Sequence, residues 1–299
     1  MSWVAFLGSV ETGLIFGLVA LGIFVTFRVL NFPDLTVDGS FALGGATAAV
    51  LIVSGMNPFL ASGAGFAAGV LAGLTTAWLH VKLRIMALLA SILTMIGLYS
   101  INIRIMKGPT VPLLTEQTVI STFRGLGLKG SEIGPIVFFV IAAAATAMLC
   151  AFLLSERGLA MRATGANPTM ARAQGVRTPR AILLGLAICN GLVGLAGALL
   201  AQAQGAADVS MGLGVVIIGL AAVIGGTAVV PARMLVLSVV ACLFGSILYQ
   251  LIVAMALSAG TFGLTASDVN LVTAVLVCVA IVFSNRVGGL GARLRSDGK

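Results

Sequence analysis

The chain has 299 residues, of which 60% are hydrophobic and only 9% are charged. In soluble domains about a quarter of the residues are Asp, Glu, Lys or Arg, so this composition excludes an ordinary soluble protein. The formal net charge is +8, which alone would fit a nucleic-acid partner. The positions of the charges, described below, indicate membrane topology instead, with lipid head groups rather than nucleic acid as the expected counterpart.

Long apolar runs predict an all-α polytopic membrane protein that forms a single transmembrane domain over residues 1–299. A helix needs about 20 apolar residues to cross the bilayer, so the chain has room for about eight to ten transmembrane helices. The run 40–54 is short and the run 213–229 is rich in glycine, so we expect one or two broken or re-entrant segments. The predicted crossings are 4–27, 40–54, 58–79, 84–104, 134–154, 181–202, 213–229, 234–256 and 269–284.

Basic residues divide unequally between the two sides of this arrangement. Thirteen of the seventeen Lys and Arg residues fall on the side of the C-terminus, and the other four fall on the opposite side. Because basic residues concentrate in cytoplasmic loops, we expect the N-terminus and the loop 105–133 outside the cell. The segment 156–180 and the tail 285–299 are expected in the cytoplasm.

The most polar stretch in the interior of the chain is residues 158–180. Within it, residues 163–176 predict a short helix that is capped at both ends. Asn167 can cap the N-terminus with Pro168 at the first helical position, and Gly175 can end the helix. A short, capped, basic helix between two spans suits a rigid contact with a soluble protein, so we expect another protein to act on this one here.

Three polar residues, Asn31, Asp34 and Asp38, interrupt the apolar sequence between the first two spans. Carboxylates at membrane depth are costly and usually face a cavity or a partner, so this segment is a candidate part of a solute pathway. The alternative is a plain cytoplasmic turn with both aspartates in water, because Arg28 marks a membrane boundary. Gln202, at the end of a later span, is expected to be a solvated loop residue.

Glycine accounts for 38 of the 299 residues, or about 13% against a usual 7%. Gly65, Gly69 and Gly73 recur every four residues, so they share one helix face and allow close helix packing. We expect this packing within one bundle, with a homodimer interface as the alternative.

The sequence has no pattern typical of catalysis or of a metal site. The four cysteines lie one per span without CxxC spacing, so they predict small core residues. The single histidine, His80, is expected to be solvated or to face head groups at a helix end. A phosphate-binding loop motif is missing. We therefore expect a protein that is not an enzyme and that holds no cofactor; any ATP would be hydrolysed by another chain.

Three segments, in order, resemble those of the permeases of bacterial ABC importers of the branched-chain amino acid and ribose type. Residues 34–46 (DLTVDGSFALGGA) resemble the family's segment after the first common span. Residues 163–176 (ATGANPTMARAQGV) are similar to its cytoplasmic coupling segment, and residues 219–227 (GLAAVIGGT) resemble a signature late in the chain. The likeness covers about residues 14–285, and the compact chain looks most like the branch labelled tryptophan/tyrosine transport permeases.

The resemblance implies a type II-like importer permease of the bacterial cytoplasmic (inner) membrane that translocates an amino acid or a related small solute. Cytoplasmic ATPase subunits, which hold ATP and Mg, would dock on the coupling segment. A periplasmic or lipid-anchored binding protein would deliver the solute at the loop 105–133, and a second permease copy would form a homodimer. For ATPase coupling the resemblance singles out Arg162, Gly165, Asn167, Arg172 and Gly175. For the solute pathway the candidates are Asn31, Asp34, Asp38, Gly225, Gly226 and Thr227.

A second hypothesis from another class is a stand-alone secondary transporter, driven by protons or sodium through Asp34 and Asp38. Such carriers often combine interrupted helices with inverted repeats. The interruption is present here without a convincing repeat. A carrier also has no need of a capped basic helix between two spans.

Overall fold

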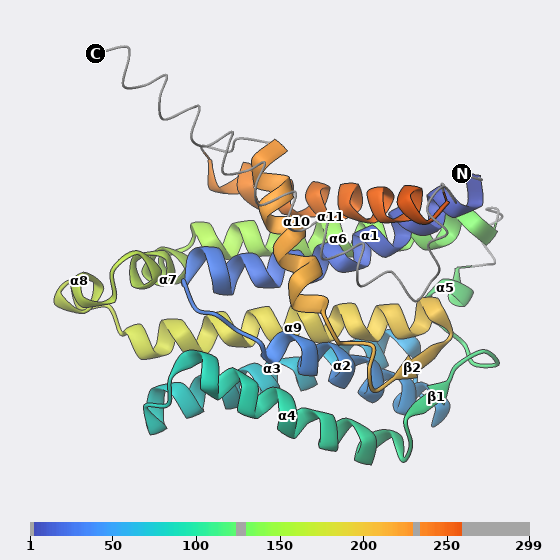
Figure 1. Ribbon diagram of the computed structural model, residues 1–299, viewed down its shortest axis with the longest axis horizontal. Helices are drawn as coiled ribbons and strands as arrows, with labels where there is room; N and C mark the ends of the chain where they lie inside the picture. The colour runs from blue at the N-terminus through green and yellow to red at the C-terminus, as the bar shows by residue number, and fades with distance from the viewer. Residues whose placement is uncertain (1–2, 124–129, 230–233, 259–299) are drawn as a thin grey trace, which may run out of the picture.

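The computed structural model describes the chain except for residues 1–2, 124–129, 230–233 and 259–299. The described part is almost entirely helical (Figure 1). The long helices are α1 (Trp3–Ile23), which continues as the π-helix η1 (Phe24–Val29), α2 (Thr36–Val53), α3 (Pro58–Leu83), α4 (Ala87–Met106), α6 (Gly130–Leu154), α9 (Thr178–Gln204) and α11 (Leu235–Ser258). The shorter elements are β1 (Thr110–Pro112), α5 (Val119–Thr122), α7 (Glu156–Ala166), α8 (Pro168–Ala173), β2 (Ala206–Asp208) and α10 (Val215–Val229).

Seven helices in the described part of the chain are long and apolar enough to cross a membrane. This confirms an all-α, multi-pass protein. The predicted crossing 40–54 is longer than expected, because α2 already begins at Thr36. The predicted crossing 213–229 is α10, whose 15 residues extend about 22 Å and fall short of a hydrocarbon core about 30 Å thick. The ninth predicted crossing, 269–284, and the tail 285–299 lie outside the described residues.

The long helices form one bundle around α9, which packs against α2 and α3 on one side and α1 on the other. In Figure 1 the long helices run side by side, with α7 and α8 at one end and the paired strands β1 and β2 at the other. These are referred to below as the α8 end and the sheet end. The short helix α10 runs across the direction of the long helices in this view.

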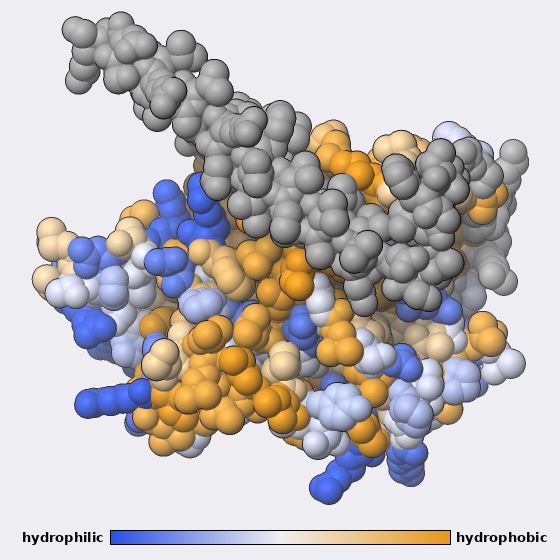
Figure 2. Space-filling view, viewed as in Figure 1, coloured by the Kyte–Doolittle hydropathy of each residue, from blue (hydrophilic) through white to orange (hydrophobic). Residues whose placement is uncertain are grey.

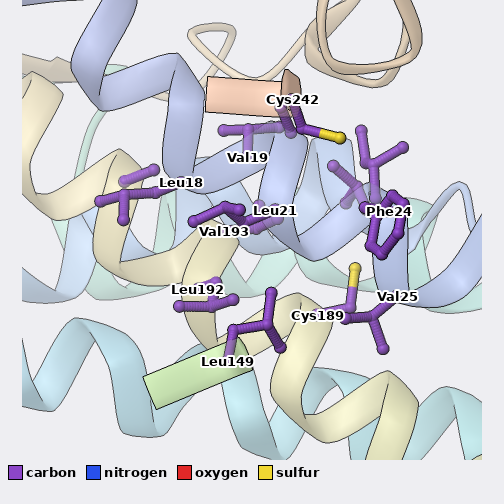
Figure 3. Close-up of a cluster of buried hydrophobic side chains, with 14 of the residues drawn as sticks. Leu18, Val19, Leu21, Phe24, Val25, Leu149, Cys189, Leu192, Val193 and Cys242 are labelled. Atoms are coloured by element: carbon purple, nitrogen blue, oxygen red, sulfur yellow. The ribbon is translucent and has the colours of Figure 1, made fainter. Parts of the chain in front are cut away.

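The main hydrophobic core lies where α1 and η1 meet α6 and α9, and it extends to α10 and α11. Figure 3 shows part of it, with Leu18 and Val19 of α1 beside Val193 of α9. Cys189 and Cys242 belong to this core, and with Cys150 they are buried and free of disulfides, as predicted for small core residues. The fourth cysteine, Cys278, lies outside the described residues.

The glycine face of α3 packs against α9 of the same chain. Gly69 and Gly73 lie so close to the carbonyl oxygens of Asn190 and Leu186 that no Cβ atom would fit, and Gly65 continues the contact. Packing within one bundle is therefore confirmed for this face.

Two polar residues that we expected near solvent or head groups have hydrogen-bond partners within the chain. The Nδ1 atom of His80 lies 2.8 Å from the carbonyl oxygen of Ile85, just beyond the end of α3. Gln202 is buried, and its side-chain amide joins the hydroxyl of Ser62 to the backbone N–H of Val119. The expectation for Gln202 was wrong, because its polar partners come from other segments of the chain. His80 is only half-buried, and its solvated or headgroup-facing position stays a prediction.

The surface is arranged as expected for a protein in a bilayer. Figure 2 shows hydrophobic residues gathered over the middle of the long helices and hydrophilic residues toward the two ends. Among the seven candidate spans, α4 is the least buried. The lipid-facing or partner-facing surface therefore includes α4.

Candidate functional site

The predicted coupling segment consists of two helices rather than one, because Asn167 interrupts it in an extended conformation. The side-chain oxygen of Asn167 accepts hydrogen bonds from the N–H groups of Thr169 (3.1 Å) and Met170 (3.0 Å). Gly175 has a φ of +82°, which favours glycine at the end of a helix. Both predicted caps are confirmed, whereas residues 163–166 belong to the preceding helix α7.

The remaining coupling candidates connect α7 and α8 to the bundle. Gly165 lies directly against a backbone carbonyl of η1, where a Cβ atom would not fit. Arg162 and Arg28 of η1 line a common cavity of about 610 Å³ at the α8 end. Arg172 of α8 donates a hydrogen bond from Nε to Oγ1 of Thr178 at the start of α9, over 3.1 Å. A displacement of α8 would therefore act on α9 directly and on η1 through α7.

Asp34 is fully buried between η1 and α2. Its carboxylate accepts hydrogen bonds from the backbone N–H of Thr36 (2.9 Å) and from the side-chain amide of Asn190 in α9 (2.7 Å). The amide oxygen of Asn190 in turn accepts a hydrogen bond from Oγ of Ser40 over 2.7 Å. A buried carboxylate is tolerated only with such partners, and the plain solvated turn is excluded for Asp34.

Asp38 is half-buried in the first turn of α2, and it caps a helix from a distant part of the chain. Its two carboxylate oxygens accept hydrogen bonds from the N–H groups of Gly214 (3.2 Å) and Val216 (2.9 Å), at the beginning of α10. A negative charge is also favourable at a helix N-terminus. Asp38 therefore fixes the point at which the non-helical residues 209–214 turn into α10.

The other predicted pathway residues lie apart from the two aspartates. Gly225, Gly226 and Thr227 lie near the far end of α10, about 15 Å along the helix from its beginning. Gly226 packs tightly against the carbonyl oxygen of Ala241 in α11. Asn31 is exposed with a φ of +53° and lines the cavity at the α8 end. The structure thus joins Asp34 and Asp38 to α9 and α10 without bringing Gly225–Thr227 to them.

Two parts of this site are absent from the sequence prediction. Asn190 is an amide in the middle of the apolar crossing 181–202, and a polar side chain at that place is a signal of a functional or structural contact in a membrane span. The second part is a cavity of about 310 Å³ between α2, α4 and residues 209–213, which Asp38 lines together with Tyr99 and Ser100. No sequence pattern connects Asp38 with these residues of α4.

Comparison with known proteins gives a consistent result. Residues 6–284 match the family described as branched-chain amino acid transport system, permease component. The chain is 34% identical over 277 residues to a tyrosine transport system permease protein of Clostridioides difficile (strain R20291), which covers 91% of this chain and 88% of that protein. It is also 34% identical over 220 residues to an uncharacterized protein of Rickettsia prowazekii (strain Madrid E), which covers 73% of this chain and 75% of that one.

The fold is similar to that of PsaBC from Streptococcus pneumoniae, whose structure was solved in complex with Fab. The TM-score is 0.51 at 15% sequence identity, and the match covers 93% of this chain and 89% of that chain. The family match extends over nearly the whole sequence and agrees with a bundle of seven candidate spans. The chain therefore belongs to the permease component family of branched-chain amino acid transport systems, as a transmembrane permease subunit of the ABC importer type.

Proposed function

We propose that this chain forms the translocation path of an ATP-driven importer for an amino acid or a related small solute. The match to the permease family over residues 6–284 is the observation that carries this proposal. The name of the Clostridioides difficile relative, a tyrosine transport permease, supports an amino acid as the solute. This chain itself would hold no cofactor.

Separate ATPase subunits, holding ATP and Mg, would dock at the α8 end. The cap at Asn167 makes α8 a defined rigid unit, and Gly165 packs α7 directly onto η1. Arg162 and Arg172 would supply positive charge for acidic residues of the ATPase. Because η1 leads into the segment that holds Asp34 and Asp38, movement of α8 would reach the beginning of α10 as a rigid-body shift.

The sheet end would face the outside of the cell and receive a periplasmic or lipid-anchored binding protein. There the loop 105–133 is held by pairing of β1 with β2. A second copy of the permease would complete the importer as a homodimer. In this orientation the N-terminus lies outside, and the C-terminus and the α8 end lie in the cytoplasm of the bacterial cell.

A proton- or sodium-coupled carrier fits the two aspartates less well. Asp34 is held by Asn190 and Thr36, and Asp38 is held by the backbone of α10. Protonation of either carboxylate would weaken these hydrogen bonds, so a cycle of proton uptake and release would disturb the contacts that hold α2 to α9 and α10. This favours the ATP-driven importer.

Affinity purification of the tagged chain in mild detergent tests the proposal. We expect a soluble ATPase to accompany it in stoichiometric amount. Met170→Asp should abolish this association, because Met170 is 61% exposed on α8. Leu114→Asp is the matched control, since Leu114 is 84% exposed at the opposite end. A chain that purifies alone, and that transports in liposomes without ATP, would instead be a secondary carrier.

A further inference from the structure

We propose that the cavity between α2, α4 and residues 209–213 binds the transported amino acid, with Asp38 receiving the ammonium group. The cavity measures about 310 Å³, and its polar lining residues are Asp38, Tyr99, Ser100 and Asn102. This is within the size range of small-molecule sites, which are about 300–1,000 Å³. The inference rests on the proposed function and assigns the place at which the permease recognises its solute.

Two hydroxyl groups at this cavity have no hydrogen-bond partner among the described residues, those of Tyr99 and Ser100. Other hydroxyls of α4 are paired within the helix. Ser91 donates to the carbonyl oxygen three residues earlier (2.9 Å), and Thr94 donates to the one four residues earlier (3.0 Å). The side chains of Tyr99 and Ser100 are exposed and line the cavity, so no part of the described chain covers their hydroxyl groups. The hydroxyls of Tyr99 and Ser100 are therefore available to a polar solute.

The charge in the cavity selects a cation. Asp38 carries a full negative charge, while the helix end that it caps contributes only about half a positive charge. Neither a Lys nor an Arg residue is among those that line the cavity. Each oxygen of Asp38 accepts one hydrogen bond from α10, and a carboxylate has about four acceptor positions. Capacity thus remains for an ammonium group.

The rest of the cavity wall is apolar, and it suits the side chain of an amino acid. The apolar lining residues include Met95 and Ile96 of α4, Ala42 of α2 and Leu213. Aliphatic and thioether groups would cover an apolar or aromatic solute side chain. An ammonium group at one side and an apolar wall at the other would orient the solute.

One wall of the cavity is connected along the chain to the sheet end. Residues 209–213, which line it, follow directly from β2, and β2 pairs with β1 of the loop 105–133 (Figure 1). The N–H of Val209 donates to the carbonyl oxygen of Pro109 over 2.9 Å. A solute released at this loop would therefore meet the cavity next to the segment that holds the loop in place.

The first test fills the cavity in the importer purified with its accompanying subunits. Ser100→Trp should abolish amino acid uptake while the ATPase still co-purifies. Ile101→Trp is the matched control, because Ile101 is the next residue of α4, is 49% exposed and does not line the cavity. Normal uptake by Ser100→Trp would overturn the inference and leave the importer function standing.

The second test measures solute binding and does not depend on transport. In Ser100→Cys, modification of residue 100 by a small methanethiosulfonate reagent is followed by mass spectrometry of its peptide. L-tyrosine and tyramine, which both carry an ammonium group, should slow the modification severalfold. The deaminated analogue 3-(4-hydroxyphenyl)propionate should not. Equal protection by all three compounds, or by none, would overturn the assignment of the ammonium group to Asp38, whether or not an ATPase accompanies the chain.

Discussion

The bond between Asp34 and Asn190 joins residues that are 156 positions apart in the chain. It connects the segment before α2 to the middle of the central helix α9. The carboxylate of Asp34 is fully buried, so the amide of Asn190 also compensates for the loss of water around a charge. Removal of this amide would leave the carboxylate without one of its hydrogen-bond donors, and loss of a partner from a buried charged group is costly.

Asn190→Leu should lower the free energy of unfolding by about 1–3 kcal/mol, since the carboxylate of Asp34 loses a donor. Thermal unfolding in detergent measures this loss. In an Asp34→Asn background the same change should cost less, because no charge is left unpaired. Additive effects of the two substitutions would contradict a direct interaction between these side chains.

At the scale of elements, the interface of α3 with α9 shows why glycine is so frequent in this chain. Glycines of α3 let the backbones of the two helices touch, so contact area rather than a hydrophobic driving force holds them together. Not every glycine of α3 has this role. Gly63 is exposed, with nothing within 4 Å of the place where a Cβ would lie.

Gly69→Ala and Gly63→Ala therefore form a matched pair on one helix. Gly69→Ala should destabilise the protein by about 1–3 kcal/mol, because the added methyl group overlaps the carbonyl oxygen of Asn190. Gly63→Ala should be neutral or should stabilise α3 by up to about 1 kcal/mol through its higher helix propensity. The test compares the melting temperatures of the two variants in the same detergent. Equal melting temperatures would mean that α3 and α9 are not in contact at Gly69.

Elements whose signals are local could be predicted from the sequence. The apolar runs predicted the spans. Asn167, Pro168 and Gly175 predicted the ends of the short helix α8, because helix caps depend on neighbouring residues. The partners of Asp34 and Asp38 could not be predicted in this way. They lie on α9 and α10, and the pairing of distant helices is set by packing, which leaves no local pattern in the sequence.

At the scale of the whole molecule, the α8 end and the sheet end lie at opposite ends of the bundle (Figure 1). The excess of basic residues at the α8 end predicts that this end faces the cytoplasm. The native cysteines of the described residues are buried, so they add little background to chemical labelling from either side.

Single cysteines at the two ends test this orientation in intact cells. Gln117→Cys, in the exposed part of the loop at the sheet end, should react with a membrane-impermeant maleimide added outside. Met170→Cys on α8 should react only after the cells are permeabilised. The opposite pattern would invert the predicted topology, and with it the places proposed for the binding protein and the ATPase.

The cap that Asp38 places on α10 bears on how this protein is made. At 15 residues, α10 is too short for the membrane to hold it upright by hydrophobic length alone. The carboxylate that fixes its beginning is synthesised about 176 residues earlier. The orientation of α10 is therefore set late in biogenesis, when Asp38 of the already inserted α2 accepts hydrogen bonds from its N-terminus. Loss of the Asp38 carboxylate would leave a chain that is inserted in the membrane but misassembled.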